Sequence, residues 1–343
     1  MTDFTFYLLI GTIVIALAFD LMNGFHDAAN AIATVVSTRV LTPTIAVFWA
    51  AFFNFVAIFV FAPKVADTIS KIVKIEAEDP TYIIVVCCGL LGAILWDLLT
   101  WWWKLPTSSS HALIGGLSGA GLAHGGLEAL RMDVLITTAE FIVLAPLLGF
   151  TLGFCMIIAL YWLCRNWTAT SVNQHFRKGQ LLSAALYSMG HGANDAQKTM
   201  GVIMALLLAG GVIEHNTPLS LLNSDTRWII LSCQLAMSLG TAFGGWRIVK
   251  TMGMKIIKLK PIGGFCAETS GAMTLFVATH AGIPVSTTHT IIGSILGIGT
   301  AISRPSRIKW SIAAKIVWAW IFTIPAAGLI STACLYLSQF VLS

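Results

Sequence analysis

Two polar strings interrupt otherwise apolar stretches of this chain, and each contains an aspartate. NGFHDAANA (23–31) and HGANDAQK (191–198) both place the aspartate close to glycine and asparagine. Carboxylate and amide oxygens are the ligands that hard cations prefer in proteins, and a charged group in an apolar phase is costly unless it is used. We therefore predict that these strings bind Na⁺, with a proton on the carboxylate as the alternative. The predicted ligands are Asp27, Asn30, Asn194 and Asp195.

Two hydroxyl-rich strings indicate a ligand of the opposite charge. LPTSSSHALIGG (105–116) and IPVSTTHTIIGS (283–294) each place a proline, followed by Ser and Thr, at the expected start of a helix. Free N–H groups, hydroxyls and the positive end of the helix dipole bind compact oxyanions such as phosphate or sulfate. Lys198 is expected either to add a positive charge to this site or to pair with Asp195. The predicted anion-binding residues are Ser108, Ser109, Ser110, Ser286, Thr287 and Thr288.

Both kinds of string occur twice, once in each half of the chain and in the same order. Asp27 aligns with Asp195 in the first pair of strings, and His111 aligns with His289 in the second pair, in both cases without gaps. A single Ser/Thr cluster in a membrane helix usually bonds only to its own backbone or to a neighbouring helix. Because this cluster recurs with the same Pro and His spacing, we interpret the chain as a tandem duplication with paired sites.

The elements that carry these strings are predicted to be membrane helices. The 343 residues are 57% hydrophobic and 10% charged, with a mean hydropathy of +0.84, which is far from the soluble norm. We expect an all-α polytopic membrane protein. The first and sixth apolar segments contain the aspartate strings and are expected to be broken helices, while the fourth and ninth begin after a proline and are expected to be half-helices or re-entrant segments. The ten segments are roughly 4–38, 42–62, 81–103, 107–125, 134–163, 180–211, 227–248, 261–281, 284–302 and 310–342.

Basic residues give the predicted orientation. An outside N-terminus places thirteen Lys and Arg in the inner connections and five in the outer ones, as the positive-inside rule requires. Both termini are therefore predicted to be extracytoplasmic, and the net charge of +5 is attributed to topology rather than to a nucleic-acid partner. Each half holds five segments, and an odd number of crossings makes the second copy enter from the opposite side. We predict two inverted repeats, 1–163 and 180–343, joined by a cytoplasmic linker at 164–179.

Five other charged residues fall inside apolar segments. Asp20 and Asp97 lie near segment breaks and are expected to be interfacial or solvated, while Glu140 and Lys315 can reach the membrane surfaces. Glu268 is too far from the ends of its segment to reach a membrane surface, and a charged residue inside the membrane indicates function by default.

Other functions fit parts of this pattern. A sulfate carrier would use the same helix starts, and a passive anion channel or a merely symmetric bundle would also be duplicated. An intramembrane Ser/His hydrolase is the alternative from another class, but a His two or three residues after Ser on one helix seldom aligns as its base. The chain lacks the Gly-x-x-x-x-Gly-Lys-Ser/Thr string of ATP-driven pumps. We favour a secondary transporter that is not an enzyme and needs no cofactor beyond a coupling ion, Na⁺ or H⁺.

The strings together resemble the PiT family of inorganic phosphate transporters. GFHDAANA (24–31) and GHGANDAQK (190–198) look like two copies of that family's Gly-Ala-Asn-Asp-type motif, and the two proline strings and WDLLTWWW (96–103) are also similar. The resemblance implies cation-coupled import of inorganic phosphate by alternating access, in the cell inner (plasma) membrane, by a homodimer. It implies phosphate and cation roles for the residues named above, and Glu268 resembles an acidic position associated with transport. His26 stands where the motif has asparagine, which puts a titratable imidazole at a possible cation site.

Overall fold

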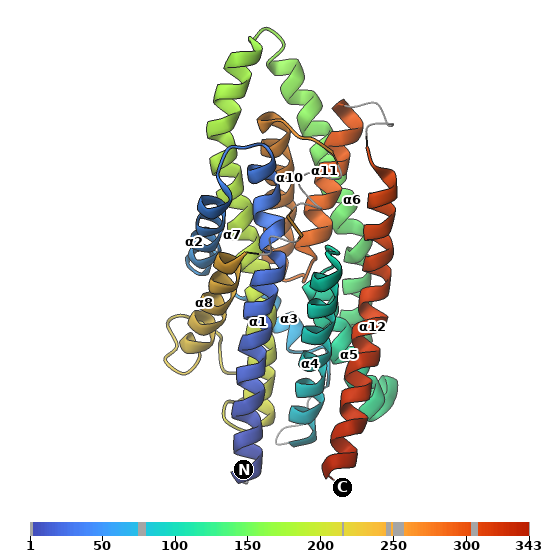
Figure 1. Ribbon diagram of the computed structural model, residues 1–343. Helices are drawn as coiled ribbons and strands as arrows, with labels where there is room; N and C mark the ends of the chain where they lie inside the picture. Colours follow the sequence, from blue (N-terminus) through green and yellow to red (C-terminus); the bar gives the residue numbers. More distant parts are fainter. Residues whose placement is uncertain are drawn as a thin grey trace.

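The protein is described by a computed structural model, which covers residues 3–74, 80–214, 216–244, 248–249, 257–302 and 308–342. Within these ranges the chain is almost entirely helical, and its only strand-like pairing is an isolated bridge between Val73 and Leu130. The long helices are α1 (Asp3–Ser37), α4 (Pro80–Trp103), α6 (Met132–Leu163), α7 (Ala169–Ala209) and α12 (Trp310–Leu342) (Figure 1). The shorter ones are α2 (Pro43–Val56), α3 (Lys64–Ile69), α5 (Ser109–Gly125), α8 (Arg227–Phe243), α10 (Pro261–His280) and α11 (Thr287–Ile302), with 3₁₀ turns at Ala57–Phe59 and Gly126–Ala129.

Four of these helices, α1, α4, α6 and α12, are long and apolar enough to cross a membrane. α6 has 32 residues. At about 1.5 Å per residue it is about 48 Å long, more than the hydrocarbon core of a bilayer requires. Large apolar side chains such as Val143 and Leu329 are exposed on the outside of the bundle, where a soluble protein would carry polar ones. The chain is a multi-pass membrane protein, as its composition predicts.

Helices that correspond in the two halves run in opposite directions. Both termini lie at the lower end of the bundle in Figure 1, and α6 and α7 are joined at its upper end. α1 and α6 therefore run upward, whereas α7 and α12, which occupy the equivalent places in the second half, run downward. One helix of each half also packs against a helix of the other half: α6 packs on α11, and α12 packs on α5.

Glycines permit these contacts between the halves. A Cβ atom on Gly293 of α11 would lie 2.9 Å from the Cα atom of Pro146 in α6, and one on Gly115 of α5 would lie 2.8 Å from the Cα atom of Ile324 in α12. Real Cβ atoms do not come this close to backbone, so a larger residue at either position would have to move a helix. Gly115 and Gly293 occupy equivalent places in the two proline strings, so the same close approach of backbones occurs once in each half.

The aspartate strings do not break their helices, which corrects the expectation for the first and sixth apolar segments. α1 is continuous through Asp27, and α7 is continuous through Asp195. Their polar side chains find partners on neighbouring helices, so no backbone carbonyl has to be released from the helix to satisfy them. The segment predicted as a linker, 164–179, is largely helical because α7 begins at Ala169.

The fourth and ninth apolar segments form short helices that follow sharp reversals of the chain. α4 and α5 form one hairpin and α10 and α11 form another, and the second helix of each has only 17 and 16 residues. The hairpins reverse through residues with positive φ, Lys104 (62°) in the first and Gly282 (73°) in the second. Each of the two directly precedes its proline string, so they are equivalent in the alignment of the halves. Each reversal brings a helix start to the middle of the bundle (Figure 1).

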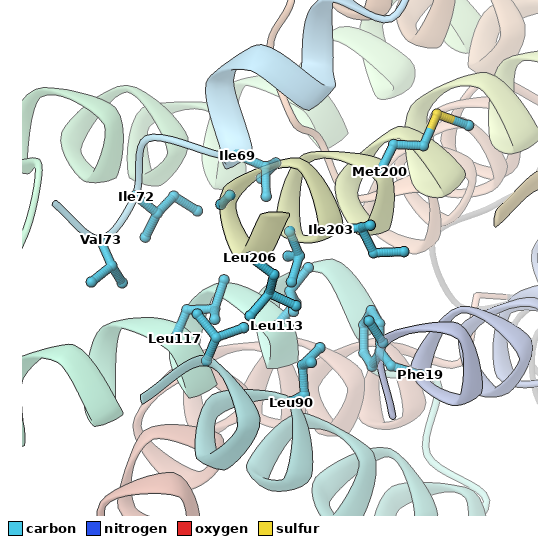
Figure 2. Close-up of a cluster of buried hydrophobic side chains, with 14 of the residues drawn as sticks. Phe19, Ile69, Ile72, Val73, Leu90, Leu113, Leu117, Met200, Ile203 and Leu206 are labelled. Carbon is cyan, nitrogen blue, oxygen red and sulfur yellow. The ribbon is translucent and has the colours of Figure 1, made fainter. Parts of the chain in front are cut away.

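Two apolar cores lie on either side of a polar layer. The first is built mainly by α1, α4, α5 and α7 and includes Phe19, Leu113 and Ile203 (Figure 2). The second begins on α1 at Ala29 and includes Ile291 of α11. Residues of α1 between Phe19 and Ala29 thus belong to neither core, and they include Asp27 and the start of the first aspartate string.

The remaining charged residues are placed differently from one another. Asp20 and Asp97 are fully buried, which corrects the expectation that they are solvated. Glu140 and Lys315 are exposed on the outside of the bundle. The orientation predicted from basic residues rests partly on positions outside the described residues, namely Arg247, Lys250, Lys255, Arg304 and Arg307.

Candidate functional site

The N-termini of α5 and α11 are built in the same way. Ser108 Oγ accepts a hydrogen bond from the His111 N–H (3.3 Å), and Ser286 Oγ accepts one from the His289 N–H (3.2 Å). These serines cap their helices by satisfying an N–H group that has no partner within the helix. The rings of the same two histidines contact each other edge to face, with centroids 4.4 Å apart. The two predicted anion ligands at the cap positions, Ser108 and Ser286, therefore hold the helix ends.

The two helix starts also lie against each other. Thr288 Oγ1 donates to the Thr107 carbonyl oxygen (3.0 Å), and Ser110 Oγ donates to the Val285 carbonyl oxygen (3.5 Å). Each bond runs from one helix start to the segment that precedes the other. Two positive helix ends therefore point at one buried region, which is an arrangement that attracts an anion.

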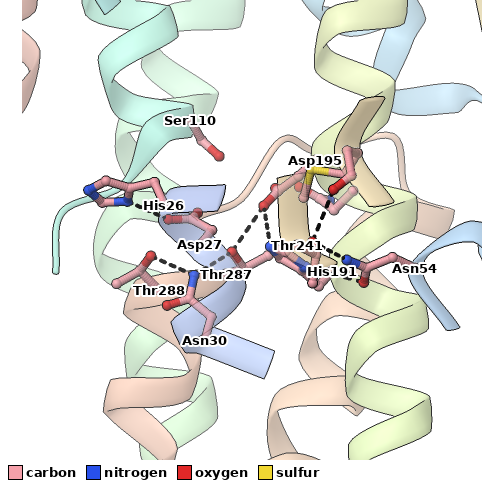
Figure 3. A network of polar contacts seen from close by, with 12 residues as sticks. His26, Asp27, Asn30, Asn54, Ser110, His191, Asp195, Thr241, Thr287 and Thr288 are labelled. Atoms are coloured by element: carbon pink, nitrogen blue, oxygen red, sulfur yellow. Dashed lines mark hydrogen bonds and ion pairs between the residues drawn. The ribbon is translucent and has the colours of Figure 1, made fainter. Parts of the chain in front are cut away.

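α1 and α7 each extend one polar side chain to the helix start of the opposite half. Asn30 Nδ2 on α1 donates to Thr287 Oγ1 (3.2 Å) and Thr288 Oγ1 (2.8 Å) of α11 (Figure 3). Lys198 Nζ on α7 donates to Ser110 Oγ of α5 (2.5 Å). Asn30 and Lys198 each lie three positions after the aspartate of their string, so they are equivalent in the alignment. The two halves thus make equivalent contacts, with a neutral amide in one and a positive charge in the other.

Asp27 and Asp195 converge on one point together with His191. One atom from each of these three side chains lies within 4.8 Å of the other two, and all three are buried. Asp195 Oδ2 lies 3.3 Å from His191 Nε2 and accepts a hydrogen bond from Thr287 Oγ1 (3.1 Å). Oxygen atoms gathered this closely suit a hard cation. The structure therefore brings two predicted cation ligands next to a predicted anion ligand.

The two aspartates are not equally compensated. Lys198 Nζ forms an ion pair with Asp195, whereas the partner of Asp27 is an imidazole, with His26 Nδ1 2.9 Å from Asp27 Oδ1. Two carboxylates and one ammonium give this group a formal charge of −1 when the histidines are neutral. A buried negative charge repels an anion and attracts a cation. One monovalent cation makes the group neutral.

His26 and Asn194 occupy equivalent positions and each contacts the hairpin beside it. Asn194 Nδ2 donates to Thr279 Oγ1 (3.1 Å) and to the Ile283 carbonyl oxygen (3.2 Å), which ties α7 to the turn before α11. His26 Nε2 lies 3.3 Å from Thr100 Oγ1 on α4. Asn194, predicted as a cation ligand, thus uses its side-chain amide to position the start of α11.

Glu268 lies apart from this group, on α10. Its Oε1 accepts hydrogen bonds from Thr34 Oγ1 (2.6 Å) and Gln180 Nε2 (2.9 Å), and its Oε2 accepts one from Ser183 Oγ (2.5 Å). Thr34 is one turn beyond Asn30 on α1, so the glutamate is linked to the same face of that helix. The structure does not bring Glu268 to the helix starts.

Two polar residues at this site have no role in the sequence prediction. Asn54 of α2 places Oδ1 3.3 Å from His191 Nδ1 and donates through Nδ2 to Thr241 Oγ1 (2.8 Å) (Figure 3). The Tyr187 hydroxyl donates to the Thr287 carbonyl oxygen (2.9 Å). Both residues lie singly within long apolar segments, so neither spacing nor repetition marks them.

The whole group is enclosed by protein. A cavity of about 870 Å³ does open beside α3, with basic side chains in its wall, but no predicted site residue lines it. The four basic residues of that wall are Lys64, Lys71, Lys74 and Arg131. The candidate site is therefore a buried polar group between helices and not an open pocket.

Comparisons identify relatives along nearly the whole chain. A probable low-affinity inorganic phosphate transporter of Rhizobium meliloti (strain 1021) is 51% identical over 340 residues, which cover 98% of both chains. A protein of the same description from Bacillus subtilis (strain 168) is 40% identical over 330 residues, covering 95% of this chain and 96% of the relative. A solved structure described as the sodium-dependent phosphate transporter has the same fold, with a TM-score of 0.85 at 23% identity, covering 98% of this chain and 100% of that one.

The family assignment rests on a match that includes both aspartate strings and both helix starts. Residues 23–331 match the phosphate transporter family. The family and the relatives are transporters and not enzymes, which excludes the hydrolase alternative. This chain belongs to the phosphate transporter family.

Proposed function

We propose that the chain imports inorganic phosphate across the inner (plasma) membrane together with Na⁺, by alternating access. Phosphate as the substrate follows from the family and from the relatives' descriptions. Na⁺ is supported by the sodium-dependent structural relative and by the oxygen ligands gathered around Asp27 and Asp195. A proton is the competing coupling ion, because His26 and His191 contact the same carboxylates.

The observation that carries this proposal is the meeting of two helix N-termini beside two aspartates. Phosphate has four oxygens and needs several donors around it. The helix starts offer backbone N–H groups and the hydroxyls of Ser109, Ser110, Thr287 and Thr288. Ser109 Oγ makes no hydrogen bond of normal length and angle among the described residues, although it lies near the Asp97 carboxylate. Lys198 adds a full positive charge beside Ser110.

Charge links the two ligands. Phosphate brings at least one negative charge to a group that already carries −1, so its entry is unfavourable until a cation has neutralised Asp27. A cation bound there raises the affinity for phosphate, and phosphate raises the affinity for the cation by the same factor. This mutual dependence of the two binding affinities is the equilibrium basis for transporting the two ligands together.

The arrangement of helices supports alternating access between inverted repeats. The proposed repeats are 1–163 and 180–343, with the cytoplasmic linker at 164–179 and both termini outside. Opposite helix directions and the exchanged packing of α6 on α11 and α12 on α5 are what two oppositely inserted copies produce. We further propose that the protein is a homodimer, which its mass in nanodiscs would test.

Uptake of labelled phosphate into proteoliposomes tests the transport cycle. We expect phosphate to accumulate when an inward Na⁺ gradient is imposed at equal pH on both sides, and not under a pH gradient without Na⁺. Accumulation under the pH gradient alone would assign coupling to protons. Flux that ignores both gradients would support a passive channel, and competition by sulfate at equal concentration would support a general oxyanion carrier.

A further inference from the structure

A second group of buried polar atoms near the central site has no hydrogen-bond partner. Asp20 and Asn23 of α1 and Thr199 of α7 are each 0% exposed. Among the described residues, no hydrogen bond of normal length and angle reaches either carboxylate oxygen of Asp20, either amide atom of Asn23 or the hydroxyl of Thr199, although the Asp20 carboxylate and the Thr199 hydroxyl are neighbours. Buried polar groups in proteins are nearly always hydrogen-bonded. Four of these five atoms are oxygens, and four incompletely bonded oxygens in one region indicate a ligand that binds oxygen.

These residues lie on either side of the contact between α1 and α7. The Asp20 carboxylate is next to the Thr199 hydroxyl and is close enough to interact electrostatically with Asp195. Asn23 is three residues from Asp20, on the same face of α1. Antiparallel packing explains the pairing, because Asp20 lies two turns before Asp27 and Thr199 lies one turn after Asp195. Because α1 runs upward and α7 runs downward in Figure 1, Asp20 and Thr199 both lie on the side of the central site that faces the lower end of the bundle.

A buried carboxylate needs a countercharge, and the nearby lysine is already engaged. Lys198 is paired with Asp195 and also donates to Ser110 Oγ and to the Val285 carbonyl oxygen. An ionised carboxylate left without a partner in a protein interior is strongly unfavourable. Lys198 also acts electrostatically on Asp20, but it makes no contact with that carboxylate, so a direct countercharge for Asp20 has to come from a ligand.

The chemistry of the unpartnered atoms identifies this ligand. Carboxylate, amide carbonyl and hydroxyl oxygens are the donors that hard cations take, and one carboxylate is neutralised by one monovalent cation. We propose that Asp20, Asn23 and Thr199 bind a Na⁺ ion at a site separate from the central one, about 10 Å along α1 from Asp27.

This site goes beyond the proposed transport cycle, because an ion held there does not touch phosphate. Asp20 adds a second negative charge to the region that phosphate must enter. Na⁺ bound at Asp20 removes that charge from the field at the central site, so it raises the affinity for phosphate from a distance. Phosphate binding should therefore require Na⁺ at two places, one at Asp27 and one at Asp20.

Equilibrium binding of ²²Na⁺ to the purified protein in nanodiscs tests the site without transport. The measurement is made without phosphate, with choline replacing Na⁺ to hold ionic strength constant. Asp20→Asn should bind one Na⁺ fewer per chain than the wild type. Glu140→Gln, which neutralises an exposed carboxylate in α6, is the matched control and should bind the wild-type number.

A second variant keeps the proposal testable if Asp20→Asn does not fold. Thr199→Val preserves the shape of the side chain and removes one oxygen, and it should weaken the affinity of one Na⁺ by about tenfold or more, as loss of a supporting polar group commonly does. Wild-type stoichiometry in Asp20→Asn, or wild-type affinities in Thr199→Val, would overturn the site and indicate that Asp20 holds a proton. Loss of one Na⁺ in Asp20→Asn alongside Na⁺-independent uptake by the wild type would uphold the site and refute Na⁺ coupling instead.

Discussion

Replacing Lys198 by asparagine would give the second half the residue that Asn30 supplies in the first. Lys198 donates to Ser110 Oγ (2.5 Å) and to the Val285 carbonyl oxygen (2.9 Å), and it pairs with Asp195. A hydrogen bond from a charged group contributes roughly 1.5–3 kcal/mol, and about 1.4 kcal/mol corresponds to a factor of ten. If Lys198 contacts phosphate, Lys198→Asn should weaken phosphate binding by about 10- to 150-fold.

The same substitution should act in the opposite direction on the cation. Asp195 loses its countercharge, and leaving one member of a buried ion pair alone costs about 3–5 kcal/mol. Na⁺ can replace the lost ammonium beside Asp195, so the variant should bind Na⁺ more tightly than the wild type. Na⁺ should also raise its unfolding temperature by more than it raises that of the wild type.

Phosphate binding measured over a series of Na⁺ concentrations separates these two effects, and thermal unfolding in the same buffers gives the stability. Lys315→Asn is the matched control, since Lys315 is exposed on α12, and it should change neither quantity. Wild-type phosphate affinity together with unchanged Na⁺ dependence in Lys198→Asn would refute the division of roles between Lys198 and Asp195.

Three other substitutions probe the aspartates, the helix contacts and the caps. Asp27→Asn should abolish phosphate uptake driven by a Na⁺ gradient while the protein remains inserted, because the neutral amide no longer attracts a cation; wild-type uptake would contradict this role. Gly293→Leu should push α11 away from Pro146 and reduce the yield of monodisperse protein in size-exclusion chromatography, and a normal yield would show that the contact is loose. Ser286→Ala should cost about 1 kcal/mol through the lost cap of α11, seen as a lower unfolding temperature, whereas Ser286→Thr should keep most of it.

Repetition in the sequence was enough to predict two matching helix starts, but not how the aspartates are accommodated within their helices. The equal spacing of His111 and His289 within their strings predicts paired helix starts, and the structure places those two rings in contact. The predicted breaks at the aspartates are absent because partners arrive from distant parts of the chain. Asn30 donates to Thr288, far away in the sequence, and no local pattern contains that information. The burial of Asp20 has the same origin, since it depends on how α7 packs against α1.

The continuity of α1 has a consequence for how its polar side chains are arranged. An unbroken helix keeps residues spaced by three and four on one face, and α1 carries buried polar residues at five such positions in succession. These residues are Asp20, Asn23, Asp27, Asn30 and Thr34. They span about 21 Å of helix, which is most of the roughly 30 Å hydrocarbon core of a bilayer. At the far end Thr34 donates to Glu268, so the row ends on another buried carboxylate. A break at Asp27 would rotate the two ends of this row away from each other, so the continuous helix that contradicts the sequence prediction is what keeps these five polar side chains on one face of α1.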